Sequence, residues 1–468
     1  MTKNSSKLII ITLLVFTYCL PLFAQQKGGM QFTLKEAQDY ALKNSPLIKN
    51  ANIDLASAKQ KIWETTAIGL PQVNGKLAGS YQITVPENIK SFSSLSNLGG
   101  WMYNVDSALS KLTNDPKFGN IEKPAPTEPT DEKDLKWGLT FDITVSQLIF
   151  SGAYIVGLQT SKTFKQLSEV SITKSEQDLI ESVTNAYFLC VIANENKLVI
   201  DSIYLATEKT LYEIKETQKV GFLEETDVDQ MQLTLTNIQN TKDMIHRQYE
   251  VAMNLLKFQM GLDLNNSIDL KDKTMDLISQ LNSSVLATKK LNVENQVDYR
   301  LLSIQEKMAN LNVKFQKSTF LPDVAIYYNH QENFNKKSFS FTPPDILGLN
   351  VTVPIFGSGQ KIAKVKQANL SLEKIRNSKE QLSQGLQLQF SDNQSAFITA
   401  MNKFQTNKSA RDLASRIYDR SIIRYKEGMI SSLELSQAQN QYLQAQSNYF
   451  NAIIEMSTAY TKLEKLLK

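Results

Sequence analysis

Two histidines, His246 and His330, are the side chains best suited to acid–base chemistry near neutral pH. His246 lies in a stretch with helical periodicity, and His330 lies in a stretch of alternating apolar residues. Neither has the serine and aspartate spacing of a catalytic triad around it. Residues 357–361 read GSGQK, but a phosphate-binding loop needs the spacing Gly-x4-Gly-Lys-Ser/Thr. These residues therefore do not predict an enzyme, and the sequence predicts no cofactor and no metal site.

The N-terminus has the pattern of a secretory signal peptide. Lys3 and Lys7 precede the apolar run LIIITLLVFTYCLPLFA, and the small residue Ala24 ends it, which predicts a signal peptide over residues 1–24. The alternative is a membrane anchor, but the apolar run is shorter than the ~20 residues that a spanning helix needs. After cleavage Cys190 is the only cysteine, which excludes an intrachain disulfide.

The charge balance bears on the class of partner. The formal net charge is +4 at pH 7, and two of the lysines belong to the predicted signal peptide. Nucleic-acid-binding domains are usually strongly basic, so this balance gives no case for a nucleic acid as partner.

The chain contains the same unit twice. Residues 147–152 read QLIFSG and residues 354–359 read PIFGSG, and each ends a run of alternating apolar residues. About 70 residues later, Gly221 and Gly428 lie in the similar segments KVGFLEETDVDQMQ and KEGMISSLELSQAQ. Such self-similarity predicts an architecture built by repetition. The predicted organisation is a first repeat over 25–262, a linker over 263–290 and a second repeat over 291–468.

Four short stretches alternate as a strand with two different faces must. They are residues 72–85, 137–147, 323–331 and 347–355, which predict β-hairpins over 72–150 and 323–356. Each stretch is roughly the 9–11 residues of a tilted membrane-spanning strand, although a half-buried hairpin of a soluble domain would alternate in the same way. The first hairpin carries an insert over 86–135, rich in Ser, Asn, Pro and Asp, which we expect to be a long loop on the outer surface.

Helical periodicity dominates the rest of the chain. The narrow apolar seam in residues 360–427, backed by Gln, Ser, Asn and Lys, is typical of a coiled coil. Each repeat is expected to open with a helix and to continue after its hairpin with a long helix and a return helix. The predicted long helices are 154–220 and 360–427, and the predicted return helices are 222–262 and 429–468. A helix over 154–220 would be roughly 100 Å long, so it must lie against neighbours of equal length.

The number of predicted strands bears on how many copies of the chain assemble. Four strands do not close a barrel, because barrels need about eight or more, and open sheet edges do not occur in lipid. Three copies would supply twelve strands. The sequence therefore predicts a homotrimer.

The ordered motifs resemble the TolC family of outer-membrane efflux proteins. The segment FTLKEAQDYALKNSPLIKNA at 32–51 resembles the first helix of the family, QLIFSGA and PIFGSGQ resemble its strand-to-helix passages, and the two glycine segments resemble its helix tips. The resemblance implies a mixed α and β membrane protein: a trimeric 12-stranded β-barrel, four strands per chain, continuous with a long periplasmic α-helical coiled-coil barrel.

The same resemblance implies a place and a function. The chain would lie in the outer membrane lipid of a Gram-negative bacterium and form the channel, or exit duct, of a tripartite efflux or type I secretion system. Its partners would be a periplasmic adaptor and an inner-membrane transporter, and it would conduct substrates passively. The alternative is a non-channel exported coiled-coil protein with a structural or adhesive role. The sequence does not indicate which substrate is transported.

By motif match, the resemblance places a gate at the helix tips. Asp227 matches the tip aspartate of the family, and Tyr425 matches a tyrosine that hydrogen-bonds to it when the pore is shut. Glu434 and Gln437 match two positions that form an acidic ring around the aperture, although only Glu434 is acidic here. Ile430 stands where some members carry an arginine, so the corresponding salt bridge is absent.

The tips would also be the docking surface for the adaptor. The matching residues are Val220, Gly221, Phe222, Gly428, Met429 and Ile430. They could also be simple turn residues, because glycine serves the end and reversal of a helix, and both statements can hold at once.

Overall fold

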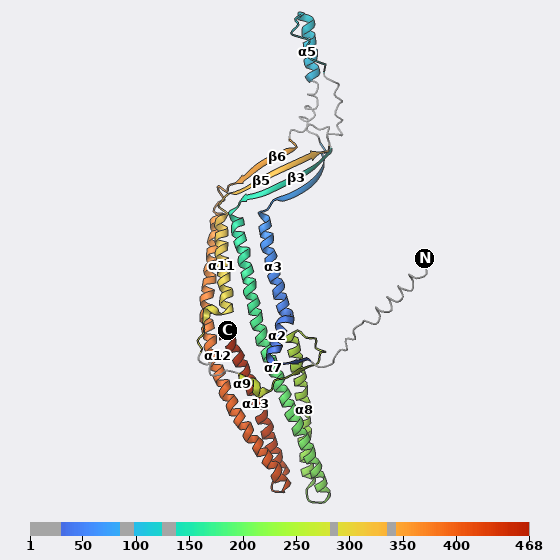
Figure 1. The fold of residues 1–468 in the computed structure, drawn as a ribbon, viewed down its shortest axis with the longest axis vertical. Coiled ribbons are helices and arrows are strands. Elements are labelled where there is room, and N and C mark those ends of the chain that lie inside the picture. Colours follow the sequence, from blue (N-terminus) through green and yellow to red (C-terminus); the bar gives the residue numbers. More distant parts are fainter. Residues whose placement is uncertain (1–29, 85–97, 124–136, 281–288, 335–342, 468) are drawn as a thin grey trace, which may run out of the picture. The chain divides into compact units, whose positions relative to one another are not determined.

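The computed structural model describes residues 30–84, 98–123, 137–280, 289–334 and 343–467 (Figure 1). The predicted signal peptide over 1–24 lies outside these residues, as do parts of the 86–135 insert. The chain divides into two compact units. One comprises the described residues of Met1–Asn52, Ile172–Gln296 and Gln384–Lys468, and the other those of Ile53–Ser171 and Val297–Ser383. Each unit takes residues from both predicted repeats, so the compact units cut across the repeats.

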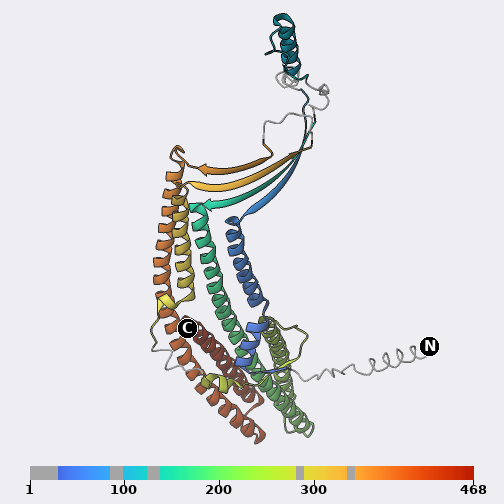
Figure 2. The ribbon, with the colours of Figure 1, turned by 45° about the horizontal axis from the view of Figure 1, so that its top comes forward.

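The second unit contains a four-stranded antiparallel sheet in the order β2-β3-β5-β6 (Figure 2). Its strands are β2 (Gln72–Tyr81), β3 (Trp137–Phe150), β5 (Asp323–Asn333) and β6 (Asp345–Thr352). Each predicted hairpin is a neighbouring pair, and β3 also pairs with β5. Among the described strands of this sheet, β2 and β6 each pair along one side only.

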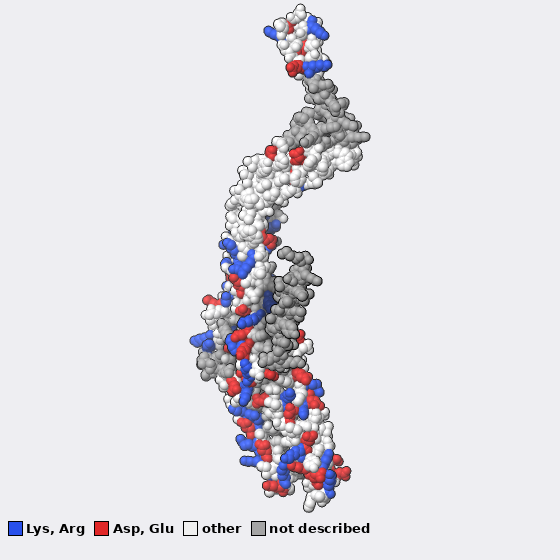
Figure 3. Space-filling model, turned by 45° about the vertical axis from the view of Figure 1, so that its right-hand side comes forward, with Lys and Arg blue, Asp and Glu red and all other residues white. Residues whose placement is uncertain are grey.

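The two faces of this sheet differ in polarity. The register places Val73 opposite Val145, Val145 opposite Tyr328 and Tyr328 opposite Leu347, so the apolar residues of all four strands share one face. Many of them are exposed within one chain, including Leu77, Leu349 and Val351. The other face is polar and hydrogen-bonded: Asn329 Nδ2 donates to Thr144 Oγ1 (2.8 Å), and Gln331 Nε2 donates to Asp142 Oδ1 (2.7 Å). Figure 3 accordingly shows the strands as a largely uncharged surface.

The structure differs from the sequence-based predictions at the ends of the strands and in the insert. Strand β2 ends at Tyr81, so Ile83 lies beyond it, and β6 ends at Thr352, before Val353 and Ile355. The insert over 86–135 is predicted as loop, but it contains helix α5 (Leu98–Thr113). The prediction weighed the polar composition of the whole insert and missed the short helical apolar period within it.

In the second unit, two helices pack together through ion pairs and an apolar cluster of Ala309, Val313, Ala368 and Leu372. Helix α3 (Pro46–Ile68) and helix α11 (Val297–Ser318) contribute to this unit, with parts of α7 (Gly152–Lys219) and α12 (Gln360–Lys426). The carboxylate of Glu306 lies 3.1 Å from Arg376 Nε and 3.0 Å from Lys379 Nζ, which joins α11 to α12. These two cations lower the pKa of Glu306, Lys379 contributing most.

The first unit holds the main hydrophobic core. Helices α2 (Leu34–Asn44), α8 (Glu225–Met260), α9 (Thr274–Gln280) and α13 (Ser432–Leu467) pack there with the remaining parts of α7 and α12. Its largest fully buried side chains are aromatic: Tyr187, Phe188, Phe397 and Tyr449. The seam positions of the long helices thus carry the core, as a coiled-coil pattern requires.

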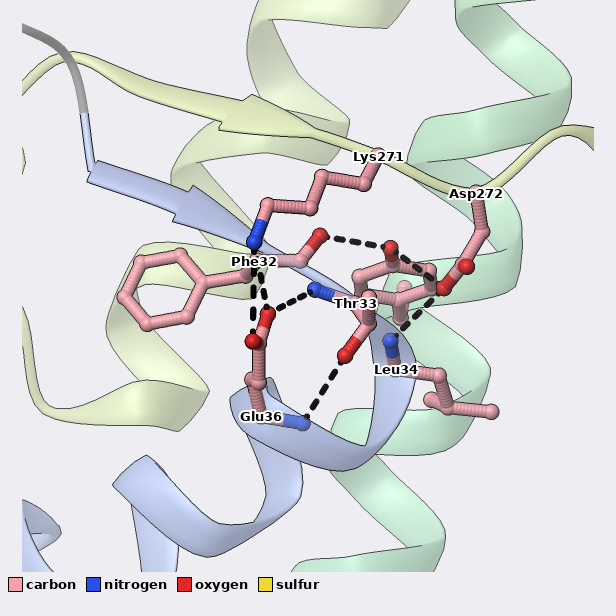
Figure 4. Close-up of polar contacts among 7 residues, drawn as sticks. Phe32, Thr33, Leu34, Glu36, Lys271 and Asp272 are labelled. Atoms are coloured by element: carbon pink, nitrogen blue, oxygen red, sulfur yellow. Dashed lines mark hydrogen bonds and ion pairs between the residues drawn. The ribbon is translucent and has the colours of Figure 1, made fainter.

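Strand pairing and hydrogen bonds join the first described residues of this unit to the segment between the two predicted repeats. Strand β1 (Met30–Phe32) pairs in parallel with β4 (Ile268–Leu270), so the predicted linker 263–290 contains a strand as well as α9. Thr33 and Glu36 form a capping box on α2, and Asp272 Oδ2 accepts from Leu34 N (2.7 Å) and Tyr187 Oη (2.8 Å) (Figure 4). Burial, reinforced by Asp272, raises the pKa of Tyr187, so this hydroxyl keeps its proton and remains a donor.

No helix in the described part of the chain has a stretch that is both long enough and apolar enough to cross a membrane.

Candidate functional site: the helix tips

Helices α7 and α12 end in the same backbone motif. Gly221 has φ of 85° and Gly428 has φ of 71°, a region that residues with a Cβ rarely adopt. In both turns the glycine N–H donates to the carbonyl three residues earlier, and the next N–H donates to the carbonyl five residues earlier, which is the Schellman motif. The acceptors are Gln218 O and Thr217 O in the first turn, and Tyr425 O and Arg424 O in the second. The two turns therefore share the same glycine conformation and the same pattern of backbone hydrogen bonds.

The residue after each glycine is apolar and exposed. Phe222 is 81% exposed and Met429 is 63% exposed, and Val220 is exposed as well. Ile430 is half-buried and packs with Tyr425 against a small core formed by Leu211, Ile214, Met231, Tyr418 and Leu435. Of the four predicted docking positions that are not glycine, Val220, Phe222 and Met429 are therefore exposed, and Ile430 packs into the core of the tip.

The return helices begin differently. Ser431 Oγ accepts from Glu434 N (3.2 Å) at the start of α13, whereas Glu224, at the start of α8, makes no side-chain cap. Asp227 and Glu434 are each the third residue of their helix, where a carboxylate interacts favourably with the helix dipole. The two carboxylates are therefore equivalent in the repeat, but their surroundings differ.

Asp227 is held by Ser432. The hydroxyl of Ser432 donates to Asp227 Oδ1 at 2.5 Å, which joins the first turn of α13 to the first turn of α8. Ser432 is 4% exposed, so the hydrogen bond is shielded from water on that side. The resemblance implies a hydrogen bond from Tyr425 to Asp227; in this structure Ser432 is the donor instead. The motif comparison did not find Ser432, because serine at a helix start is common and the partner depends on how α8 and α13 approach.

Tyr425 lies close enough to Asp227 to be affected by its charge. Burial, followed by the nearby carboxylate of Asp227, raises the pKa of Tyr425 to about 12. Its hydroxyl oxygen is buried and has no hydrogen-bond partner among the described residues. A buried donor without a partner costs about 1–3 kcal/mol, so this hydroxyl would gain from any acceptor that came within reach.

Two more polar contacts lie along the same face of α13, on the C-terminal side of Ser432. Ser436 Oγ lies 3.0 Å from Thr234 Oγ1 of α8, and Gln439 Nε2 donates to Thr207 Oγ1 of α7 at 2.6 Å. All four side chains are buried. Residues 432, 436 and 439 have the spacing of a coiled-coil seam, where apolar residues are usual. Polar residues at seam positions were the signal in the sequence that could have identified these layers.

Glu434 and Gln437 are exposed and one helical turn apart, so they share a face of α13. Neither side chain takes part in the hydrogen bond between Asp227 and Ser432. A cavity of about 680 Å³ lies beside the tips, lined by side chains that include Phe222, Tyr425 and Ile430. The ion pair between Lys426 Nζ and Glu213 Oε2 (3.2 Å) joins α12 to α7 beside it.

The two histidines belong to different units and each contacts a carboxylate. His246 Nε2 lies 2.8 Å from Asp201 Oδ1 between α8 and α7, and His330 Nδ1 lies 2.8 Å from Asp345 Oδ1 between β5 and β6. Both contacts join neighbouring elements of the fold, and neither involves the tips.

Comparison with known proteins supports the interpretation from the motifs. Residues 294–467 match the family described as outer membrane efflux protein. The outer membrane protein TolC of Vibrio cholerae is 22% identical over 313 residues, which cover 66% of this chain and 67% of that protein.

Solved structures show the same fold. The CmeC outer membrane channel of Campylobacter jejuni matches with a TM-score of 0.68 and 19% identity, covering 92% of this chain and 85% of that one. The open state of the MtrE outer membrane channel of Neisseria gonorrhoeae matches with a TM-score of 0.68 and 14% identity, covering 93% and 88%. The family match over residues 294–467 and the similarity to TolC together indicate an outer membrane efflux protein, located in the outer membrane of Gram-negative bacteria, and the solved structures show that the chain as a whole has the fold of such channels.

Proposed function

We propose that this chain forms the exit duct of a tripartite efflux or type I secretion system, through which substrates leave passively. The observation that carries the proposal is the four-stranded sheet with one apolar, exposed face and one polar face. Strands with this alternation suit a barrel wall between lipid and a water-filled lumen. A structural or adhesive coiled-coil protein would have no use for such a sheet.

The duct is proposed to be a homotrimer. Strands β2 and β6 each lack a second neighbour among the described strands, and an unpaired sheet edge in lipid leaves backbone groups without partners. Joining β6 of one copy to β2 of the next would close a barrel of twelve strands. Native mass spectrometry of the protein released from outer membranes in mild detergent tests this: a trimer is expected, and a stable monomer would argue against the duct.

The duct is proposed to be gated at the tips. The contact between Asp227 and Ser432 and the two polar layers beside it add hydrogen bonds to the apolar packing that holds α13 against α7 and α8, so the seam is only partly apolar. Polar groups exchange their partners for water when such a seam opens, so opening costs less free energy than separating an apolar seam. Asp227 could then exchange Ser432 for Tyr425, whose hydroxyl has no hydrogen-bond partner in the described part of the chain.

The aperture is proposed to carry a ring of Glu434 side chains. Glu434 is exposed at the first turn of α13, and three copies would supply three carboxylates. Charged rings of this kind favour cations and repel anions. Gln437, on the same face, would add polar but uncharged side chains.

The partners are proposed to be a periplasmic adaptor and an inner-membrane transporter, with the adaptor docking at the tips. Phe222 and Met429 support this, because they are large apolar side chains held open by rigid glycine turns. A photo-crosslinking amino acid at position 222 or 429 should capture the adaptor in intact cells, and one at exposed position 447 of α13 should not. Equal capture at all three positions would contradict docking at the tips.

A further inference from the structure

Helix α5 carries its apolar residues on its open side. The stripe consists of Leu98, Trp101, Met102, Val105, Ala108, Leu109 and Leu112, and all of these side chains are exposed. Trp101 is 63% exposed and Leu112 is 83% exposed. Their spacings of one, three and four residues place them along one face of the helix.

The polar side of the same helix is the covered side. Asp106 is buried, and its Oδ2 accepts from Gly119 N (2.9 Å) and Ile121 N (3.0 Å). A side chain at Gly119 would meet Ser110 Oγ at 2.9 Å, so this segment lies directly against the helix. The described residues that follow α5 therefore fold back over its polar side, and no described residue covers the apolar stripe.

This arrangement is the reverse of a surface helix in a soluble protein. A helix of 16 residues is marginal in water, and most helical stability comes from packing of the apolar face. An open stripe of this kind therefore indicates an interaction surface. We propose that the α5 stripe packs against the α5 stripes of the other copies of this chain, which rests on the homotrimer of the proposed function.

Charge and spacing favour a second copy over a lipid surface as the occupant. The stripe has no charged residue, so identical stripes do not repel each other, and its positions correspond to a, d and e of a heptad, as in helix–helix contacts. Helices that lie on membranes usually have a polar face rich in Lys and Arg. Helix α5 has one basic residue, Lys111, and its one acidic residue, Asp106, is bound to backbone N–H groups.

A trimer would also bring the helices together at high local concentration. Each copy places α5 in the connection between β2 and β3, so three copies supply three identical stripes, and contact between them becomes intramolecular within the trimer. The contact would tie the three connections to one another at that end of the strands.

The test uses two single-cysteine positions in the full chain. Val105→Cys lies at the centre of the stripe, and Asn104→Cys is an exposed neighbour on the side of the helix. The native Cys190 is buried, so it does not compete. After oxidation of the protein in outer membranes, we expect a covalent dimer with Val105→Cys in several-fold higher yield than with Asn104→Cys. Adding Leu109→Gln to Val105→Cys should lower the yield, with the trimer unchanged by native mass spectrometry.

Three results would overturn the inference. Equal or absent dimer from both positions in an intact trimer would remove the α5 contact and leave the proposed duct standing, whereas a monomer by mass spectrometry would remove both. Strong quenching of Trp101 fluorescence by brominated lipid, measured as the difference from Trp101→Phe, would instead assign the stripe to the membrane.

Discussion

At the scale of single residues, the stability of the tips depends on which side chain donates a hydrogen bond to Asp227. In this structure the donor is Ser432, and Tyr425 has a buried hydroxyl without a partner among the described residues. A hydrogen bond to an ionised carboxylate is worth more than one between neutral groups. The serine should therefore matter more for holding the tip than the tyrosine.

The first prediction compares these two side chains. Ser432→Ala should lower the free energy of tip opening by about 1–2 kcal/mol, because Asp227 loses its donor. Tyr425→Phe should leave it unchanged or raise it, by up to about 1–3 kcal/mol, because it removes a buried hydroxyl that has no partner among the described residues. Hydrogen exchange of the first turns of α13 measures the opening, with the exposed Ser447→Ala as control. A larger loss from Tyr425→Phe than from Ser432→Ala would contradict the structure.

The second prediction concerns pH. Burial and Asp227 raise the pKa of Tyr425 from 10.0 to about 12, so the neutral phenol is the form that the fold stabilises. Its contribution to stability is fully present below pH 10 and is lost as the pH rises through 12. The phenolate absorbance of the protein minus that of Tyr425→Phe should titrate near 12. Titration of this difference near 10 would show that the hydroxyl is open to water.

At the scale of helices and strands, helical periodicity was sufficient to predict the long helices. Helix α7 spans Gly152–Lys219 against a predicted 154–220, and α12 spans Gln360–Lys426 against a predicted 360–427. Both helices end where the sequence places a glycine, because the turn that follows each helix needs a residue with positive φ. Helix α5 was missed because its stripe is short, and the partner of Asp227 could not be predicted because Ser432 is separated from it by 205 residues.

The third prediction tests the turns. Gly221→Ala and Gly428→Ala should each destabilise the tip by about 1–2 kcal/mol, because a Cβ is unfavourable at positive φ. There is open space around both positions, so the cost is in the backbone alone. The control is Gly385→Ala inside α12, which also has open space and should stabilise by about 0.5–1 kcal/mol. Thermal unfolding followed at the tips measures all three; equal effects of the three changes would contradict the assigned turns.

The fourth prediction tests the two faces of the sheet. Leu349→Asp places a charge on the apolar face of β6 and should impair assembly in the outer membrane, at a cost below the about 2–4 kcal/mol of a Lys or Arg near the middle of the bilayer. Asn350→Asp places the same charge one residue later, on the polar face, and should assemble normally. The amount of heat-resistant oligomer in outer-membrane fractions measures both. The reverse order of effects would mean that the apolar face does not contact lipid.

At the scale of the whole molecule, the elements of the two predicted repeats are interleaved in one sheet and in the helical units. The two repeats contribute two strands each to one sheet and two long helices each to the helical units, so neither repeat is a domain by itself. The sheet keeps two outer strands, which supports closure by further copies. The repeats also differ where function is proposed: the first carries α5 and Asp227, and the second carries Ser432, Tyr425 and Glu434.

The most direct test of the proposed duct is the current through the purified protein in a planar lipid bilayer. The account predicts discrete single-channel steps with a preference for cations that weakens in Glu434→Gln and reverses in Glu434→Lys, because the proposed ring of Glu434 carboxylates would lie at the aperture. Gln437→Glu should strengthen the preference by adding a second ring. A folded, membrane-inserted protein that gives no discrete conductance would contradict the duct, and an unchanged ion preference in Glu434→Lys would remove Glu434 from the aperture.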